Sequence, residues 1–234
     1  MDKFRNKYRI QSARLQTWDY SNAGAYFITI CTAGRAHYFG NIENGHMKLT
    51  EMGKIAETEW LKTFEMRPDM NLLMGPWVVM PNHFHAIICI GDNQYNTQTQ
   101  PVGLSLGDND GDNDRGNDGG NDGGNDPGND PGNDPGNDRG NVETQCIASL
   151  RANDITKNHN QCGPQSKNLA SIVRGFKTAV TTGARKIHAN FAWQSRFHDH
   201  IIRDNAEYQR IGNYIESNPA HWEDDKFFNS ETSE

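Results

Sequence analysis

Two histidines separated by one residue offer the clearest prospect of chemistry in this chain. His83 and His85 fall in the run Met-Pro-Asn-His-Phe-His-Ala-Ile-Ile-Cys-Ile of residues 80–90. Strand alternation would place both imidazoles on one face and Phe84 on the other, where it would anchor the strand in the core. Two rigidly held imidazoles can bind one divalent cation, although this spacing is equally typical of an exposed strand that carries two histidines.

A second histidine pair has the same spacing. In His198-Asp199-His200 the middle residue is charged, so no apolar side chain anchors the strand between the two imidazoles. We interpret this pair as structural, or as a strand edge that contacts substrate, in preference to a metal site.

Tyr214 and Asn218 form the other candidate site. They lie four residues apart near the end of a predicted helix, so their side chains project from the same side. A phenol attacks a phosphodiester when the phosphate is polarised and the phenol proton is removed, and a bound cation supplies the polarisation. Asn218 would add a neutral oxygen ligand. The structural alternative is that Tyr214 packs over the helix and Asn218, before Pro219, merely ends it.

Periodicity and capping predict the elements that position these residues. Thr50 and Asp204 are expected N-caps of two helices, and Pro219 stops the second helix. Pro81-Asn82 separates two strands that should form an antiparallel pair. The expected strands are 25–32, 45–49 (which would pair with 25–32), 72–80, 83–90 and 192–202; the expected helices are 51–65, 168–188 and 205–217.

A polar, repetitive tract interrupts this pattern. Residues 107–140 repeat Gly-Asn-Asp-Pro-like units with ten aspartates and two arginines, so they account for the formal net charge of −7. A tract without large apolar residues cannot offset the entropy of ordering. We expect the first part of one domain (1–92), a disordered insertion (93–165), the second part of that domain (166–222) and a polar tail (223–234).

The size and composition of the chain limit its class. With 234 residues and 34% hydrophobic content, it supports one ordinary core. No segment approaches the roughly 18 consecutive apolar residues of a membrane span. The sequence therefore predicts a single catalytic domain in the cytoplasm, without a membrane partner.

Four segments resemble one family. Residues 80–85 are similar to the HUH motif of the single-strand DNA transposases, and residues 213–219 are similar to their tyrosine helix. Residues 20–31 and 193–204 resemble a narrower group, the REP-associated tyrosine transposases. The four motifs occur in the family's order and span most of the chain outside the insertion, which departs from the family pattern.

The resemblance implies an α+β fold, with a ferredoxin-like antiparallel sheet and helices on one face. It implies that His83, His85 and Asn218 bind magnesium or manganese while Tyr214 attacks the scissile phosphate. The products would be a 5′-phosphotyrosine bond and a free 3′ hydroxyl, and their reversal would need no nucleotide cofactor. Family members recognise hairpins of palindromic DNA repeats, so single-stranded hairpin DNA is the expected partner of a monomer or homodimer.

Basic residues of the N-terminal region, of the second predicted helix and of the last predicted strand are candidate DNA contacts, although each could equally belong to an ordinary solvated face. The candidates are Arg14, Arg174, Lys177, Arg185, Lys186 and Arg196. Two alternatives to a transposase stay open. A catalytically idle protein would bind hairpin DNA without cleavage, whereas an HUH replication or mobilisation nickase would be expected to carry a helicase or primase region.

Overall fold

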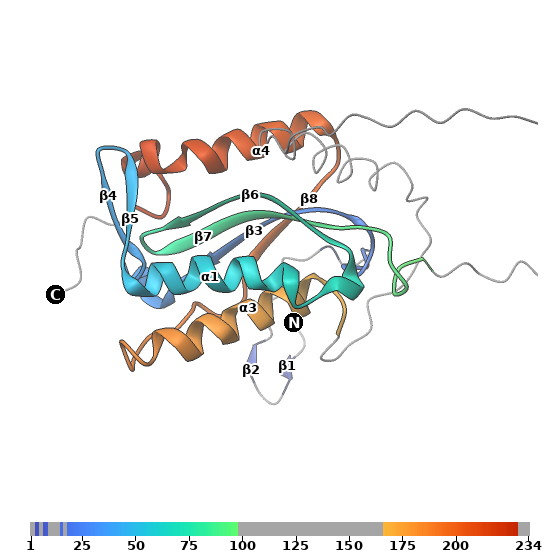
Figure 1. The fold of residues 1–234 in the computed structure, drawn as a ribbon, viewed down its shortest axis with the longest axis horizontal. Coiled ribbons are helices and arrows are strands. Elements are labelled where there is room, and N and C mark those ends of the chain that lie inside the picture. Colours follow the sequence, from blue (N-terminus) through green and yellow to red (C-terminus); the bar gives the residue numbers. More distant parts are fainter. Residues whose placement is uncertain (1–2, 5–6, 9–14, 16–17, 98–165, 229–234) are drawn as a thin grey trace, which may run out of the picture.

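A four-stranded antiparallel sheet forms the centre of the structure. The computed structural model describes residues 3–4, 7–8, 15, 18–97 and 166–228, and its ribbon is shown in Figure 1. The strand order is β6-β7-β3-β8. The strands are β3 (Gly24–Cys31), β6 (Leu72–Met80), β7 (His83–Ile90) and β8 (His198–Ile202); a separate pair joins β1 (Lys3–Phe4) to β2 (Lys7–Tyr8). The expected α+β class with an antiparallel sheet is confirmed.

The two central strands are covered on both faces. All eight residues of β7 are buried, and in β3 only Phe27 is half-buried. The antiparallel register pairs Thr29 of β3 with His85 of β7. Because directly paired residues of neighbouring strands share a face, the Thr29 hydroxyl lies beside the imidazole of His85.

Two helices cover one face of the sheet. α1 (Glu51–Glu65) begins at the predicted cap, where the Thr50 side chain accepts a hydrogen bond from the Gly53 amide at 3.2 Å. It packs beside α3 (Leu169–Ala184). Phe84 lies between them, with ring centroids 5.0 Å from Trp60 and 5.1 Å from Phe176. Burial of each such ring stabilises the fold by about 1.5–3 kcal/mol, so Phe84 is the anchor that its position in the sequence predicts.

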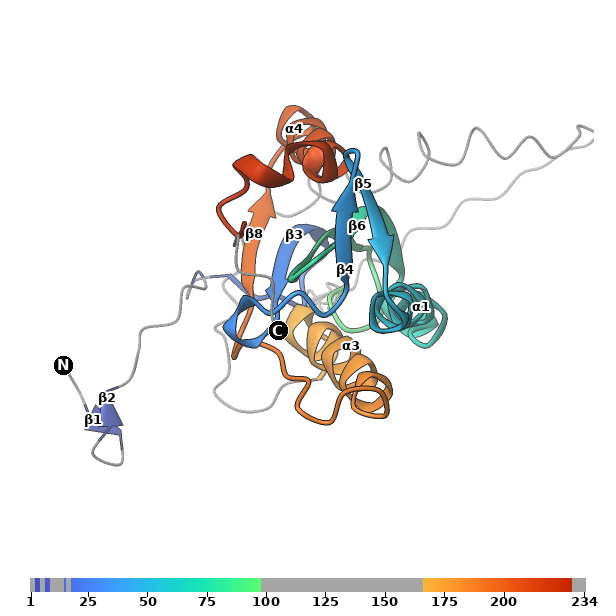
Figure 2. The ribbon, with the colours of Figure 1, turned by 90° about the vertical axis from the view of Figure 1, so that its left-hand side faces the viewer.

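The third helix, α4 (Asn205–Ser217), lies on the opposite face, as Figures 1 and 2 show. The expectation of helices on one face therefore holds for α1 and α3 and not for α4. The reason is the composition of β7, which places Ile87 and Cys89 on the same face as His83 and His85. α4 covers these apolar residues with a stripe formed by Tyr208, Ile211 and Ile215.

The segment around residues 45–49 pairs differently from the prediction. β5 (His46–Leu49) forms a separate hairpin with β4 (Gly40–Glu43) and does not pair with β3. Its two-residue turn is Asn44-Gly45, with φ of 51° and 74°. Asn-Gly in this conformation makes the tight turn that favours local hairpin pairing, which explains the difference.

β8 begins later than the predicted strand 192–202. Arg196 has a φ of 70°, outside the strand region, and the Lys177 ammonium donates hydrogen bonds to the carbonyls of Gln194 and Arg196 at 2.8 and 3.1 Å. These contacts hold residues 193–197 as a loop, joined to the sheet by one bridge between Thr32 and Trp193. Within the described residues, no helix is both long enough and apolar enough to cross a membrane.

Side chains on either side of the gap 98–165 meet at one carboxylate. The Tyr95 hydroxyl donates to Asp69 Oδ2 at 2.8 Å, and Lys167 pairs with the same carboxylate and lies 5.0 Å from the centroid of the Tyr95 ring. The segments before residue 98 and after residue 165 are therefore both held at Asp69. The predicted insertion falls almost entirely outside the described residues, and the expected domain limits stay a prediction.

We predict that replacing residues 98–165 with a short Gly/Ser linker preserves the fold. The ends of the segment are already held together, and closing a shorter loop costs less entropy. Under reducing conditions, which remove the disulfide bond of Cys89 from the comparison, thermal unfolding should give a Tm within a few degrees of the parent. The same replacement with Asp69→Ala should unfold at a lower temperature, whereas loss of cooperative unfolding in the linker variant alone would show that the deleted segment supports the core.

Candidate metal centre and tyrosine

His83 and His85 lie side by side on the face of the sheet that α4 covers. Their side chains are 0% and 1% exposed, and their ring centroids are 4.4 Å apart. Strand β7 imposes this arrangement because residues two apart share a face. The two imidazoles share one face of the strand, as alternation predicts, and their role as metal ligands stays a prediction.

The Nδ1 atom of each imidazole has its own hydrogen-bond partner. His83 Nδ1 lies 2.9 Å from Asn82 Oδ1, and Asn82 Nδ2 in turn donates to the Phe227 carbonyl at 2.8 Å, which fixes the amide orientation. His83 therefore donates from Nδ1. His85 Nδ1 lies 2.9 Å from the Thr29 hydroxyl. With both Nδ1 atoms occupied, each ring presents Nε2 to the space beside α4, an orientation typical of metal-binding histidines.

Burial keeps both rings neutral. It lowers the pKa of His85 to about 3, and burial together with the neighbouring His85 lowers the pKa of His83 well below its usual value. A neutral imidazole with a proton on Nδ1 has a lone pair on Nε2. His83 Nε2 is buried without a hydrogen-bond partner, which normally costs about 1–3 kcal/mol.

α4 brings Tyr214 and Asn218 to the same place. Asp204 caps this helix as predicted, and the stripe of Tyr208, Ile211 and Ile215 fixes its rotation. The Tyr214 hydroxyl lies 3.3 Å from His85 Nε2. Asn218, which follows the last residue of α4, is 3% exposed, and its Oδ1 is buried without a partner.

Asp225 completes the group, although no motif in the sequence predicts it. Its Oδ2 accepts hydrogen bonds from Asn218 Nδ2 at 3.0 Å and from the Tyr214 hydroxyl at 3.2 Å. Ligand atoms of His83, His85 and Asp225 all lie within 4.8 Å of one another. Asp225 stands third in the run Glu-Asp-Asp of residues 223–225, so no spacing signal distinguishes it. The short helix η3 (Asn218–Asp224) turns the chain back toward the sheet and brings it in.

These donors fit a divalent cation. Two imidazole nitrogens and a carboxylate oxygen lie within 4.8 Å of one another, and Asn218 is hydrogen-bonded to that carboxylate. Two buried atoms of these residues, His83 Nε2 and Asn218 Oδ1, lack any hydrogen bond. Buried polar atoms are nearly always satisfied, so two unsatisfied atoms within this group of residues point to an absent partner. A cation bound by both would satisfy them.

Tyr214 has one side in solvent, unlike the histidines. Its side chain is 39% exposed, and burial of the remainder, together with the Asp225 carboxylate, raises its pKa to about 12. The phenol therefore keeps its proton at neutral pH unless a positive charge is nearby. Phe27 packs edge-on against this ring, with centroids 6.3 Å apart.

In the second histidine pair, His200 links two elements of the fold. His200 Nε2 lies 2.8 Å from Glu207 Oε1, which ties β8 to the first turn of α4. Among the described residues, the group of His, Cys, Asp and Glu side chains with metal-binding spacing consists of His83, His85 and Asp225. The interpretation of His198 and His200 as something other than a metal site agrees with this arrangement.

The candidate DNA contacts fall into three sets. Arg174, Lys177, Arg185 and Arg196 line one groove of about 600 Å³ along α3, together with Trp193 and Phe197. Lys186 is exposed and lies outside the lining of that groove. Arg14 lies outside the described residues. The groove is on the α3 face of the sheet, opposite the histidines.

Comparison with known proteins found a similar sequence and a similar structure. No family model matches the chain. An uncharacterized protein of Haemophilus influenzae is 28% identical over 219 residues, which cover 93% of this chain and 92% of that protein. A solved structure of a REP-associated tyrosine transposase bound to a REP hairpin is also similar, with 15% identity and a TM-score of 0.46, over 91% of this chain and 74% of that one.

The buried histidines predict a specific acid sensitivity. The unfolded chain binds protons at both positions below about pH 6.5, whereas folded His85 stays neutral down to about pH 3, so stability falls as pH falls through this range. Each such histidine contributes a slope of about 1.4 kcal/mol per pH unit. Between pH 7 and pH 5, metal-free parent protein should lose about 2 kcal/mol more than His85→Asn in urea denaturation. His46→Asn, at an exposed position of β5, should behave like the parent; equal pH dependence in His85→Asn would contradict the assignment of His85 as buried and neutral.

Proposed function

We propose that this protein nicks and rejoins single-stranded hairpin DNA through Tyr214, as a metal-dependent single-strand endonuclease and strand transferase. The observation that carries the proposal is the position of the Tyr214 hydroxyl, 3.3 Å from His85 Nε2 and 3.2 Å from Asp225 Oδ2, two residues whose ligand atoms group with those of His83. One phosphate can contact the phenol and a cation bound by these atoms at the same time.

Magnesium or manganese would be held by His83, His85, Asn218 and Asp225, and would polarise the scissile phosphodiester and favour the phenolate. Manganese suits two imidazole ligands better, because magnesium strongly prefers oxygen.

In the chemical step, Tyr214 is the nucleophile and Asp225 accepts its proton. Asp225 Oδ2 already accepts the hydrogen bond of the Tyr214 hydroxyl, so it is the carboxylate placed to receive the phenol proton. The phenol oxygen attacks phosphorus, the bond from phosphorus to the 3′ oxygen breaks with its electron pair on that oxygen, and the 3′ oxygen becomes a hydroxyl by taking the proton that Asp225 has received from the phenol. The 5′-phosphotyrosine bond retains the energy of the phosphodiester, so attack by a 3′ hydroxyl reverses the step.

The basic groove supports a nucleic-acid partner. Its lining combines four cations with Trp193, Phe197 and threonines, and none of the described residues that line it is acidic. Cationic grooves of this kind bind phosphates and stack bases. β8 is the edge strand next to Arg196 and Phe197, so DNA that reaches both the groove and Tyr214 would pass around this edge.

The direct test is covalent capture of DNA. Single-stranded hairpin DNA from beside the gene, labelled at its 3′ end, should form an adduct with the protein in Mn²⁺ that survives denaturing electrophoresis. Tyr214→Phe should form none, while Tyr38→Phe, at a half-buried position outside the site, should match the parent. An adduct with Tyr214→Phe would refute the proposed nucleophile. Hairpin binding without any adduct in Mg²⁺ or Mn²⁺ would identify a binding protein instead.

The hydrogen bond between His85 Nδ1 and the Thr29 hydroxyl predicts an effect on metal affinity. Thr29→Val keeps the shape of the side chain but removes the partner of His85 Nδ1, so Mn²⁺ affinity should fall about 10–100-fold in calorimetry. Thr29→Ser keeps the hydroxyl and should stay close to the parent. Equal affinities of the parent and Thr29→Val would show that this hydrogen bond does not orient a ligand.

The groove predicts a dependence on ionic strength. Arg174→Ala should weaken binding to hairpins of any sequence and lower the slope of log affinity against log salt by about 1, as expected for the loss of one phosphate contact. Lys186→Ala, outside the groove lining, should change the slope less. Fluorescence anisotropy at several salt concentrations measures both, and equal slopes for Arg174→Ala and the parent would remove the groove from the DNA path.

A further inference from the structure

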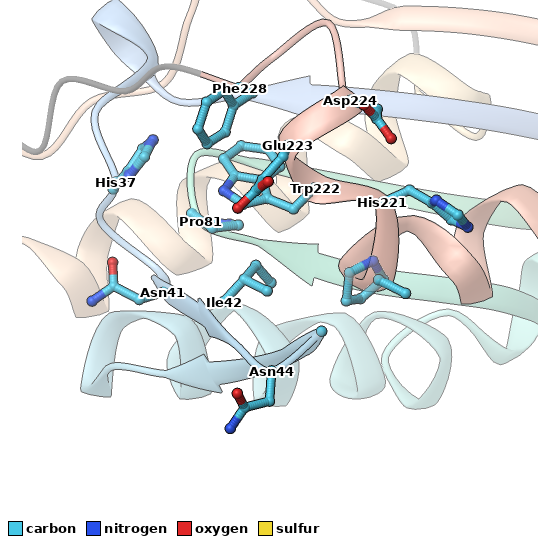
Figure 3. A pocket seen from close by; sticks show the side chains of 13 residues that line it. His37, Asn41, Ile42, Asn44, Pro81, His221, Trp222, Glu223, Asp224 and Phe228 are labelled. Carbon is cyan, nitrogen blue, oxygen red and sulfur yellow. The ribbon is translucent and has the colours of Figure 1, made fainter.

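A polar pocket of about 550 Å³ lies beside the metal centre, outside the site described above. It is formed between the β4–β5 hairpin and η3, and Figure 3 shows it from close by. Its lining includes His37, Asn41, Asn44, Trp222, Glu223 and Phe228.

The pocket adjoins the histidines through two shared segments of chain. Pro81, at its wall, precedes Asn82 and His83, and Trp222 lies four residues after Asn218 in η3. The Trp222 ring is tilted against the His83 ring, with centroids 5.9 Å apart. A DNA strand whose phosphate reaches Tyr214 therefore has a neighbouring nucleotide near this pocket.

The charges of the pocket select against a phosphate and in favour of a base. Two carboxylates, Glu223 and Asp224, belong to the lining, and no lysine or arginine does so among the described residues. Carboxylates repel phosphate but accept hydrogen bonds from the amino groups of nucleobases. The cations lie instead on the side of the histidines, where Arg35 and Lys226 are 5.1 and 4.9 Å from the centroid of the Phe227 ring.

The remaining walls also suit a flat, polar ring. Phe228 is 39% exposed at the rim, and Ile42 and Pro219 supply apolar contacts. Asn41 and Asn44 offer amide donors and acceptors from the hairpin.

We infer that this pocket binds an unpaired nucleobase close to the cleaved bond and sets the sequence preference of the site. The favoured bases are those with amino donors for Glu223, namely adenine, cytosine and guanine. Thymine fits least, because carbonyl oxygens flank its single N–H and would face the carboxylate. This inference rests on the proposed function, since it assigns part of the same DNA strand to the pocket.

The test uses binding by Tyr214→Phe, so that it does not require cleavage. Hairpin oligonucleotides carry, at each of the two positions on either side of the expected cleavage point, one of the four bases or an abasic unit. At one position, abasic and thymine oligonucleotides should bind roughly tenfold more weakly than the best amino base in fluorescence anisotropy. Adding Glu223→Gln should reduce this discrimination to about threefold or less. Adding Glu216→Gln, on the exposed side of α4, should leave it unchanged.

The same oligonucleotides, tested for adducts with the parent protein, separate the two proposals. Adducts without base discrimination at any position, or equal effects of Glu223→Gln and Glu216→Gln, would overturn the pocket assignment and leave the nuclease intact. Discrimination in binding without any adduct would support the base pocket and refute the nuclease.

Discussion

The orientation of two buried imidazoles is the constraint on which the site depends. Each ring could present either nitrogen to the space below α4. Because Nδ1 of His83 bonds to Asn82 and Nδ1 of His85 bonds to Thr29, both rings present Nε2 to that space. Burial then keeps the rings neutral, so that they offer lone pairs and not positive charge. The cost is an unsatisfied buried atom at His83, a destabilisation that a bound cation would remove.

The proposed nucleophile, Tyr214, is positioned by the core in the same way. Tyr208, Ile211 and Ile215 pack on Ala25, Ile87 and neighbouring residues, and this contact fixes the side of α4 that carries Tyr214. Packing on both faces of the sheet therefore fixes the positions of the site residues. Phe84 anchors β7 from below, and α4 docks from above, so ligand and phenol positions are set by rigid elements. Asp225 joins from a short turn after α4 and links the Tyr214 hydroxyl to Asn218.

Residues with a strict local signal were predictable from the sequence. Alternation in β7 placed His83, His85 and Phe84 correctly, and the caps Thr50 and Asp204 located α1 and α4. The sequence of β7 also indicates that both faces of the sheet are covered. Ile87 and Cys89 share the histidine face, and these apolar side chains need an apolar partner. The turn Asn44-Gly45 is typical of a β-hairpin and indicates pairing of β5 with β4, so the predicted pairing of residues 45–49 with 25–32 is wrong. Asp225 had no such signal, since only the fold of η3 distinguishes it from Glu223 and Asp224.

The most direct test of this account is a crystal structure of the protein with Mn²⁺, in which anomalous scattering locates the ion. The account predicts one strong peak in contact with Nε2 of His83, Nε2 of His85 and oxygen atoms of Asn218 or Asp225, within reach of the Tyr214 hydroxyl. An ion bound elsewhere, or imidazoles turned so that Nδ1 faces the ion, would contradict it.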